Sequence, residues 1–92
     1  MIRSWANSAT RRFGEERRNK FSGLDEMAAM ELLAVLNAAT SLADLSPLQS
    51  VGLHKLKGDR RGKWAMTVNG PWRICFRFSD GHAWEVEIVN YH

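Results

Sequence analysis

The stretch KWAMTVNGPWRICFRFSDGHAWEVEI, residues 63–88, decides the fold, because apolar and polar residues alternate along it with the period of a β-strand. Two short breaks, NGP at 69–71 and SDG at 79–81, divide the stretch into three runs. Such alternation is typical of an antiparallel sheet with one covered face and one open face. The stretch therefore predicts a meander of strands, which the segment before it, from Val51 onward, extends to about four.

The pairing register follows from the rule that residues directly opposite each other share a face of the sheet. Three-residue loops at 69–71 and 79–81 keep apolar residues opposite apolar residues, whereas two-residue loops would mix the faces. The predicted pairs are Val68–Trp72, Met66–Ile74 and Trp64–Phe76 in the first hairpin, and Phe76–Trp84, Ile74–Val86 and Trp72–Ile88 in the second. The same register places Arg73 opposite Glu87, so a purely structural role for Arg73 as an ion-pair partner stays open.

Two helices are predicted upstream of the sheet, where apolar residues recur at helical spacing. Asn7 or Ser8 is placed to cap a short helix over residues 8–19. Ser22 and Asp25 have the spacing of a capping box at the start of a longer helix. The side chains expected in the core from this segment are Leu24, Met27, Ala28, Met30, Leu32, Val35, Leu36 and Ala39.

The order of these elements predicts an α+β fold, with N-terminal helices packed on one face of a mainly antiparallel sheet of four to five strands. The fifth strand would be the segment IRSW, residues 2–5. With 92 residues and no linker or repeat, we expect a single domain over residues 1–92. The single cysteine, Cys75, excludes an intramolecular disulfide and fits a reducing compartment such as the cytoplasm.

The net charge of +3 is unevenly distributed along the chain. Residues 1–23 carry +4, residues 24–50 carry −4, residues 51–77 carry +6 and residues 78–92 carry −3. A basic segment beside aromatic residues is typical of a surface that meets phosphate groups, although a solvated strand surface has the same composition. Charge alone therefore leaves nucleic-acid binding and a plain solvated surface open.

The residues that carry chemistry come from separated segments. They are His54, Lys55, Lys57, Arg60, Arg61 and Lys63 from LHKLKGDRRGKW, Arg73 and Arg77 from WRICFRF, and Tyr91 and His92 from the end of the chain. Cleavage of RNA needs a base for the 2′-hydroxyl, cations for the developing charge and an acid for the leaving oxygen, and these side chains supply all three. The histidines and the cysteine lack paired metal-ligand spacing, so neither a metal nor another cofactor is expected. For each of these residues taken singly, a structural role is the favoured interpretation.

Two longer stretches resemble a known family. LHKLKGDRRGKWAMTVNGPWRICFRF, residues 53–78, followed by GHAWEVEIVNYH, residues 81–92, is similar to the HigB branch of the RelE/ParE toxin superfamily of bacterial toxin–antitoxin modules. The similarity lies in the L-x-x-L-K-G-D-R-x-G loop, the V-N-x-x-W-R-I hairpin and the closing Tyr-His pair. It implies a RelE-like microbial RNase fold and cleavage of messenger RNA in the ribosomal A site without a metal. It also implies a cognate helix-turn-helix antitoxin, similar to HigA, that binds and silences the toxin.

Carried over residue by residue, the resemblance implies that the catalytic residues are His54, Lys57, Arg73, Tyr91 and His92. In this family the last strand delivers its terminal residues to the scissile phosphate, which accounts for the Tyr-His pair at 91–92. The other basic residues, expected to bind RNA or the ribosome, are Lys55, Arg60, Arg61, Lys63 and Arg77. Asn90 departs from the family's frequent aspartate, and an amide cannot accept a proton as a carboxylate does, so the assignment of acid and base stays open.

Two other functions are compatible with the same fold. ParE-like relatives inhibit DNA gyrase without hydrolysing anything, and a plain RNA-binding module would need only the basic surface. The combination of His54 and His92 with a Lys/Arg cluster favours the nuclease, because a pure inhibitor has no need of it.

Overall fold

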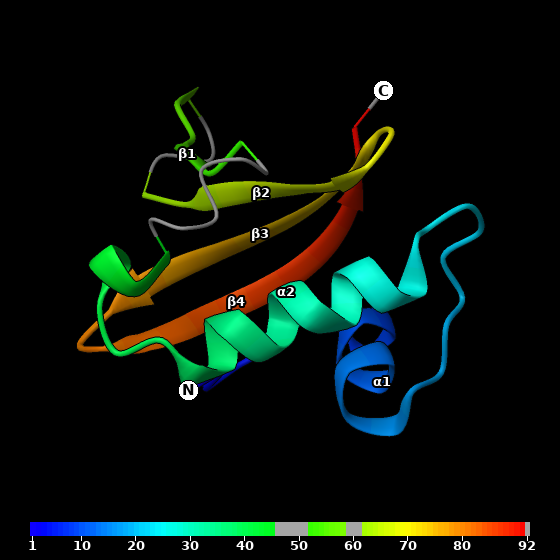
Figure 1. Ribbon diagram of the computed structural model, residues 1–92, viewed down its shortest axis with the longest axis horizontal. Coiled ribbons are helices and arrows are strands. Elements are labelled where there is room, and N and C mark those ends of the chain that lie inside the picture. The colour runs from blue at the N-terminus through cyan, green and yellow to red at the C-terminus, as the bar shows by residue number, and fades with distance from the viewer. Residues whose placement is uncertain (46–51, 59–61, 92) are drawn as a thin grey trace.

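The computed structural model describes residues 1–45, 52–58 and 62–91, and it shows two helices against one face of an antiparallel sheet (Figure 1). The elements are α1 (Ser8–Glu16), α2 (Glu26–Ala38), β1 (His54–Lys55), β2 (Trp64–Asn69), β3 (Trp72–Ser79) and β4 (His82–Asn90). The four strands follow one another in the order β1-β2-β3-β4. This arrangement confirms the predicted α+β fold.

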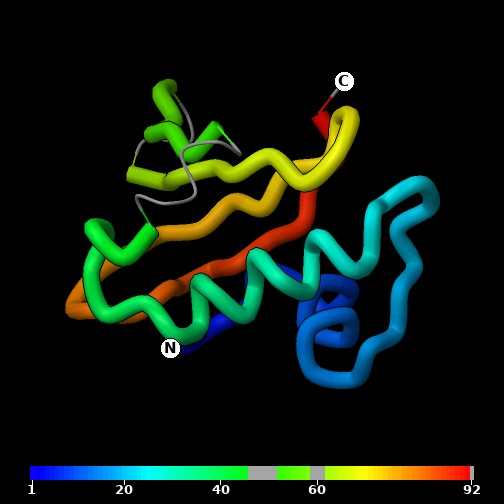
Figure 2. The backbone as a smooth tube through the Cα atoms, viewed as in Figure 1, coloured from blue at the N-terminus to red at the C-terminus, as the bar shows by residue number. Residues whose placement is uncertain are grey.

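The first residues of the chain lie along the free edge of β4 (Figure 2). Ile2 and Trp5 form isolated parallel bridges to Ala83 and Val86. Backbone hydrogen bonds tie the two segments, including one of 2.7 Å from the Arg3 amide to the Ala83 carbonyl. The predicted N-terminal strand therefore joins the sheet, but only through these two bridges.

Helix α1 begins and ends through local contacts. Asn7 caps it, because its side-chain Oδ1 accepts a 2.9 Å hydrogen bond from the Thr10 amide. The helix ends at Glu16, earlier than predicted, because Arg17 adopts a left-handed conformation with φ of 61°. Gly14 lies against Trp5: a Cβ at this position would be 2.3 Å from the indole ring. The glycine thus lets Trp5 pack directly on α1.

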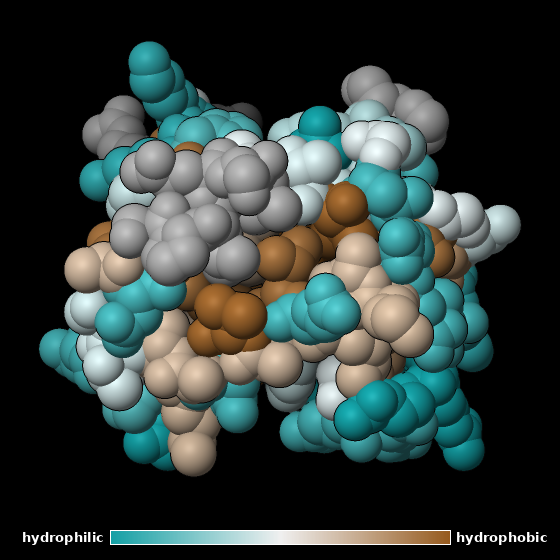
Figure 3. All heavy atoms as spheres, viewed as in Figure 1, coloured by the Kyte–Doolittle hydropathy of each residue, from teal (hydrophilic) through white to brown (hydrophobic). Residues whose placement is uncertain are grey.

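Helix α2 differs from the prediction in its cap and in its buried face. Its N-cap is Asp25, which accepts from the Ala28 amide at 3.1 Å, and not Ser22. The residues buried along this segment are Leu24, Ala29, Leu32, Leu33, Leu36 and Ala39. Met27 and Val35, predicted to lie in the core, are 74% and 37% exposed. The prediction failed because α2 is apolar around most of its circumference, so spacing alone does not select one face; Figure 3 shows the apolar residues that remain visible from the α2 side.

The β2–β3 hairpin is only partly as predicted. The pairs Trp64–Phe76 and Met66–Ile74 are confirmed. Near the turn the register shifts, so that Asn69 rather than Val68 pairs with Trp72 and the loop has two residues, Gly70 and Pro71. A β-bulge absorbs the extra residue. Asn69 also accepts from the Asp25 amide at 2.8 Å, and so fastens the end of β2 to the start of α2.

The β3–β4 hairpin corrects the second predicted register. Its loop has two residues, Asp80 and Gly81, with φ of 54° and 77°, as in a type I′ turn. A bulge at Glu85, whose φ is 54°, then shifts the pairing. The observed pairs include Arg77–Trp84, Cys75–Glu87, Ile74–Ile88, Arg73–Val89 and Trp72–Asn90. The predicted pairs Phe76–Trp84, Ile74–Val86, Trp72–Ile88 and Arg73–Glu87 are therefore wrong.

The core lies between the helices and the apolar face of the sheet. Its largest fully buried side chains from the sheet are Met66, Ile74, Phe76 and Val86, and α1 and α2 contribute Phe13 and Leu36. We call the opposite face of the sheet the outer face; it carries Arg73, Cys75 and Arg77 of β3 and the residues paired with them. Cys75 and Ala65 lie on the outer face and are nevertheless fully buried.

Candidate active site

Tyr91 and Arg73 meet at the β2–β3 turn. The Tyr91 amide donates to the Pro71 carbonyl at 2.7 Å, which holds the end of β4 beside this turn (Figure 1). Arg73 Nη1 donates to the carbonyl oxygens of Gly70 at 2.7 Å and Trp72 at 3.0 Å. The Arg73 guanidinium lies 5.6 Å from the centre of the Tyr91 ring, within cation–π range. Two of the predicted catalytic side chains are thus brought together.

Cys75 lies beneath the Tyr91 side chain. Its Sγ is 3.6 Å from the Tyr91 hydroxyl oxygen, and the thiol is fully buried. Because Cys75 and Arg73 are two residues apart on β3, both project from the outer face. The residues that pair here across β3 and β2, Cys75 and Ala65, are both small, which leaves space above the sheet for an aromatic ring.

His54 lies on the same face, at the far edge of the sheet. It pairs with Ala65, which pairs with Cys75, so the three residues form one row across β1, β2 and β3. Two strand spacings separate His54 from Cys75, about 10 Å. The exposed imidazole of His54 donates from Nδ1 to the Gly52 carbonyl at 2.7 Å, because a carbonyl can only accept. In the neutral ring this fixes the lone pair on Nε2, which can act as a base.

Arg77 occupies the other end of the outer face. Its Nε donates to the Glu85 carboxylate, and both side chains are half-exposed. The Arg77 guanidinium also lies against Gly62, where an added Cβ would come within 2.8 Å of Nη1. Exposed ion pairs contribute little to stability. The contact with Glu85 therefore orients the Arg77 guanidinium on the surface without burying its charge.

The predicted RNA-binding lysines are less closely grouped. Lys55 pairs with Trp64, which pairs with Phe76, so Lys55 belongs to the helix-covered face and the structure separates it from His54. The Leu56 amide donates to the Lys63 carbonyl at 2.8 Å, which continues the β1–β2 ladder by one step. Lys57 follows as an exposed residue. The other three predicted site residues, Arg60, Arg61 and His92, lie outside the described residues.

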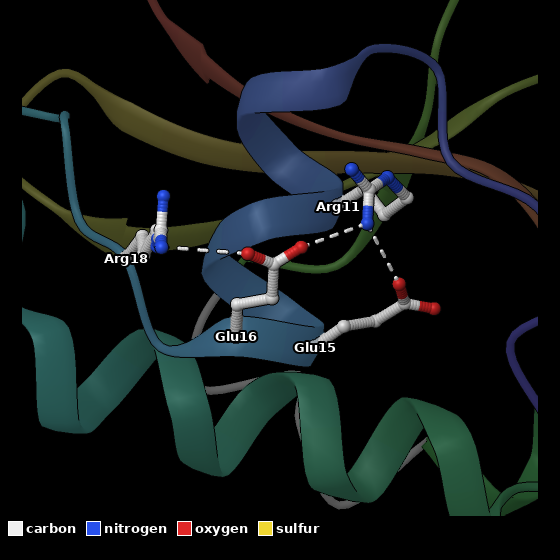
Figure 4. Close-up of polar contacts among 4 residues, drawn as sticks. All are labelled: Arg11, Glu15, Glu16 and Arg18. Carbon is white, nitrogen blue, oxygen red and sulfur yellow. Dashed lines mark hydrogen bonds and ion pairs between the residues drawn. The ribbon is translucent and has the colours of Figure 1, made fainter.

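The N-terminal basic segment forms its own charge network, away from the outer face. Arg11 Nη1 contacts the carboxylates of Glu15 at 3.2 Å and Glu16 at 3.0 Å, and Arg18 lies 3.5 Å from Glu16 (Figure 4). The hydrogen bond that Arg11 donates to Glu15, followed by the one that it donates to Glu16, raises the pKa of Arg11. These arginines are on or next to α1, on the helix side of the sheet, and so do not extend the candidate site.

One outer-face residue was missed by the sequence reasoning. Trp84 was assigned to the core, but it pairs with Arg77 on the outer face and is 37% exposed. The signal that could have found it is the Asp80-Gly81 dipeptide, which strongly favours a two-residue type I′ turn. That turn changes which residues oppose each other and so changes the face of Trp84.

Within residues 1–45, 52–58 and 62–91, no group of three or more His, Cys, Asp or Glu side chains is arranged to hold a metal ion. Neither helix of the described chain has the length and apolar character needed to cross a membrane.

Comparison with known proteins identifies the family. Residues 4–92 match the HigB-like toxin family, described as RelE-like toxins of the type II toxin–antitoxin system HigB. The chain is also 42% identical over 60 residues to a protein of Proteus vulgaris named Endoribonuclease HigB; the match covers 65% of this chain and 64% of that relative. Because the family match spans nearly the whole chain, this protein belongs to the HigB-like toxins of type II toxin–antitoxin systems.

Proposed function

We propose that this toxin is an endoribonuclease that acts on the ribosome and cleaves messenger RNA in the A site. The observation that carries the proposal is the common position of Arg73, Tyr91 and His54 on the outer face, where a cation, an aromatic ring and an imidazole flank a surface about two strands wide. The naming of the Proteus vulgaris relative as an endoribonuclease supports the same reaction class.

In the proposed reaction, the 2′-oxygen of one nucleotide attacks the adjacent phosphorus while the bond to the 5′-oxygen of the next nucleotide breaks. The products are a 2′,3′-cyclic phosphate and a free 5′-hydroxyl. One group takes the proton of the 2′-hydroxyl and another protonates the leaving 5′-oxygen. We assign these transfers to His54 and His92, and the Nε2 lone pair of His54 makes it suited to the role of base.

Arg73 is proposed to stabilise the charge that develops on the phosphate. Its Nη1 is occupied by two carbonyl oxygens, which fixes the plane of the guanidinium. No carboxylate of the described residues forms an ion pair with Arg73, so Nε and Nη2 remain for a two-point contact with phosphate. Lys57 would add a point charge, and Tyr91 would orient or stack on the nucleotide.

The basic residues around the site are proposed to hold the ribosome and the message. They are Lys55, Arg60, Arg61, Lys63 and Arg77. We further propose that the toxin works in the cytoplasm and that a helix-turn-helix antitoxin similar to HigA silences it, because membership of a toxin–antitoxin family implies such a partner.

The test is to express the toxin and map the ends of cellular RNA. Ribosome-dependent cleavage predicts new 5′ ends that fall at fixed codon positions in translated messages, and their loss when translation initiation is blocked. DNA damage without codon-linked RNA ends would instead indicate a gyrase inhibitor. RNA binding without new ends would indicate a plain RNA-binding module. Either result would overturn the proposal.

A further inference from the structure

Trp84 is an exposed aromatic residue in a strand whose alternation would otherwise bury it. Ala83 occupies the fully buried position at this point of β4, and Trp84 faces the other way, paired with Arg77. The bulge at Glu85, with its left-handed φ of 54°, restores the alternation so that Val86 and Ile88 are buried again. An indole on the surface gives up much of the stabilisation that burial would provide. Packing in the core therefore does not account for the position of Trp84, and a role on the surface is needed to explain it.

The indole is held in one orientation. Its Nε1 donates to the Ser79 carbonyl at 3.2 Å, across the turn that joins β3 and β4. The His82 ring lies edge-on to it, with 6.4 Å between ring centres and an interplanar angle of 86°. The Glu85 amide donates to Ser4 Oγ at 2.8 Å, which anchors the bulge to the N-terminal segment. The aromatic surface is thus positioned before any ligand arrives.

The described neighbours of Trp84 on the outer face include a pair of opposite charges. Arg77 is the cross-strand partner of Trp84, and its guanidinium forms an ion pair with Glu85, the residue that follows Trp84 in β4. A protein-docking surface is expected to be a contiguous apolar patch. Among the described residues, the large exposed hydrophobic side chains other than Trp84 belong to the N-terminus, to α2 and to the segment after α2, and are Met1, Met27, Val35 and Leu42. An aromatic ring next to an arginine is instead the pairing found where single-stranded nucleic acid is bound, with the base on the ring and the phosphate near the cation.

We propose that Trp84 is a stacking platform for an unpaired RNA base on one side of the cleavage site, with Arg77 near the phosphate of that nucleotide. The inference rests on the proposed function. Arg73 and Arg77 are four residues apart on β3, about 13 Å, so Trp84 meets a nucleotide that flanks the reacting one. The ligand is a segment of single-stranded RNA that runs along the outer face from Tyr91 towards Trp84.

The first experiment compares Trp84→Ala, Trp84→Phe and Trp84→Leu in cleavage of a defined message on purified ribosomes. Loss of one stacked base predicts a rise in KM of about 5- to 100-fold for Trp84→Ala, with the single-turnover rate at saturation little changed. Trp84→Phe keeps a π-face and should restore most of the affinity, whereas Trp84→Leu keeps apolar bulk alone and should behave like Trp84→Ala. Met27→Ala, at an exposed apolar residue on the helix side, is the matched control and should leave KM unchanged.

The second experiment removes the base instead of the indole. A set of messages is made, each with one abasic nucleotide at a different position near the cut. At one flanking position, the abasic nucleotide should raise KM for the wild type but not for Trp84→Ala. If the effects of the abasic nucleotide and of Trp84→Ala on KM are additive at every position, the inference is overturned. Equal KM values for the Phe and Leu variants would do so too, and their comparison stays informative even if Trp84→Ala folds poorly.

Other outcomes separate this inference from the proposed function. A wild-type toxin that cuts no RNA refutes the function itself. A Trp84→Ala toxin that cuts with wild-type KM and rate refutes only the platform. If that variant keeps normal kinetics but is no longer silenced by the antitoxin, Trp84 is a protein contact and the RNA assignment is wrong.

Discussion

The Tyr91 hydroxyl lies 3.6 Å from the Cys75 thiol, and the thiol is fully buried although Cys75 belongs to the outer face of the sheet. The chain has one tyrosine and one cysteine, so each can be followed without interference from others of its kind. The relationship places the Tyr91 ring over the centre of the candidate site.

The cover over Cys75 can be tested by thiol reactivity. We expect Tyr91→Ala to expose the thiol and speed its reaction with a disulfide reagent, because access limits the reactivity of a buried cysteine. Tyr91→Phe keeps the ring and should leave the reaction slow. Urea unfolding of each variant serves as the control for global stability. Equal reaction rates in all three proteins would show that Tyr91 does not cover Cys75.

Arg73→Ala is expected to lower the single-turnover cleavage rate. The expected loss of transition-state stabilisation is about 2–4 kcal/mol, as for loss of a preorganised donor to a developing oxyanion. Arg73→Lys should recover part of the loss, since an ammonium keeps the charge but not the two-point contact. Circular dichroism should show an intact fold for both variants.

The alternative role of Arg73 as a partner of Glu87 can be tested separately. The structure pairs Arg73 with Val89, and the Glu87 carboxylate instead accepts from Asn7 Nδ2 at 3.3 Å. Double-mutant analysis of Arg73→Ala and Glu87→Gln should therefore give a coupling energy close to zero in urea unfolding. A clear coupling would restore the structural role.

His54→Ala and His92→Ala should each reduce cleavage by about 10²–10⁴-fold, the usual contribution of a positioned acid or base. Single-turnover rates measured against pH identify the base, because loss of the base removes the rise in rate on the acidic limb. A variant that cuts at the wild-type rate has lost no proton-transfer group, and the transfer would then belong to the other histidine.

Thr10→Val should destabilise the fold by about 1–3 kcal/mol, because it leaves a buried donor without its acceptor. Thr10 is fully buried, and its Oγ1 accepts from the Ile88 amide of β4 at 3.1 Å. Thr10→Ser keeps the hydroxyl and should lose much less. The free energy of unfolding in urea measures both, and a Thr10→Val variant as stable as the wild type would show that the hydrogen bond to Ile88 does not contribute to stability.

His82 predicts a pH dependence of stability. Partial burial of the ring, with added repulsion from Arg3 and the N-terminal amino group, lowers its pKa, and Asp80 opposes the shift only weakly. The folded state then favours the neutral ring. The contribution of the neutral His82 ring to the free energy of unfolding is complete above the unfolded-state pKa of about 6.5. It is lost as the pH falls through the lower folded-state pKa. Urea unfolding of His82→Gln between pH 8 and 5 should show a weaker decline than the wild type, and parallel curves would contradict the assignment.

Much of the fold can be predicted from the sequence, because the signals for it are local. Asn7 caps α1 and glycine-containing breaks separate the strands, since capping and turn formation depend on neighbouring residues. The alternation in WRICFRF correctly assigned Trp72, Ile74 and Phe76 to the core. The resemblance of residues 53–92 to HigB toxins predicted the family that the comparison shows.

The tertiary structure alone decided which residues share the outer face. The bulges at Val68 and Glu85 depend on contacts between residues far apart in the sequence, such as Asn69 with Asp25 and Glu85 with Ser4. The alternation of residues within one strand does not predict such contacts. Each bulge turns the residues beyond it to the opposite face, because side chains in a strand alternate with a period of two. For this reason the sequence suggests the candidate catalytic residues and, through the Asp80-Gly81 turn, the face of Trp84, whereas the return of Val86 and Ile88 to the core is decided by the bulge at Glu85.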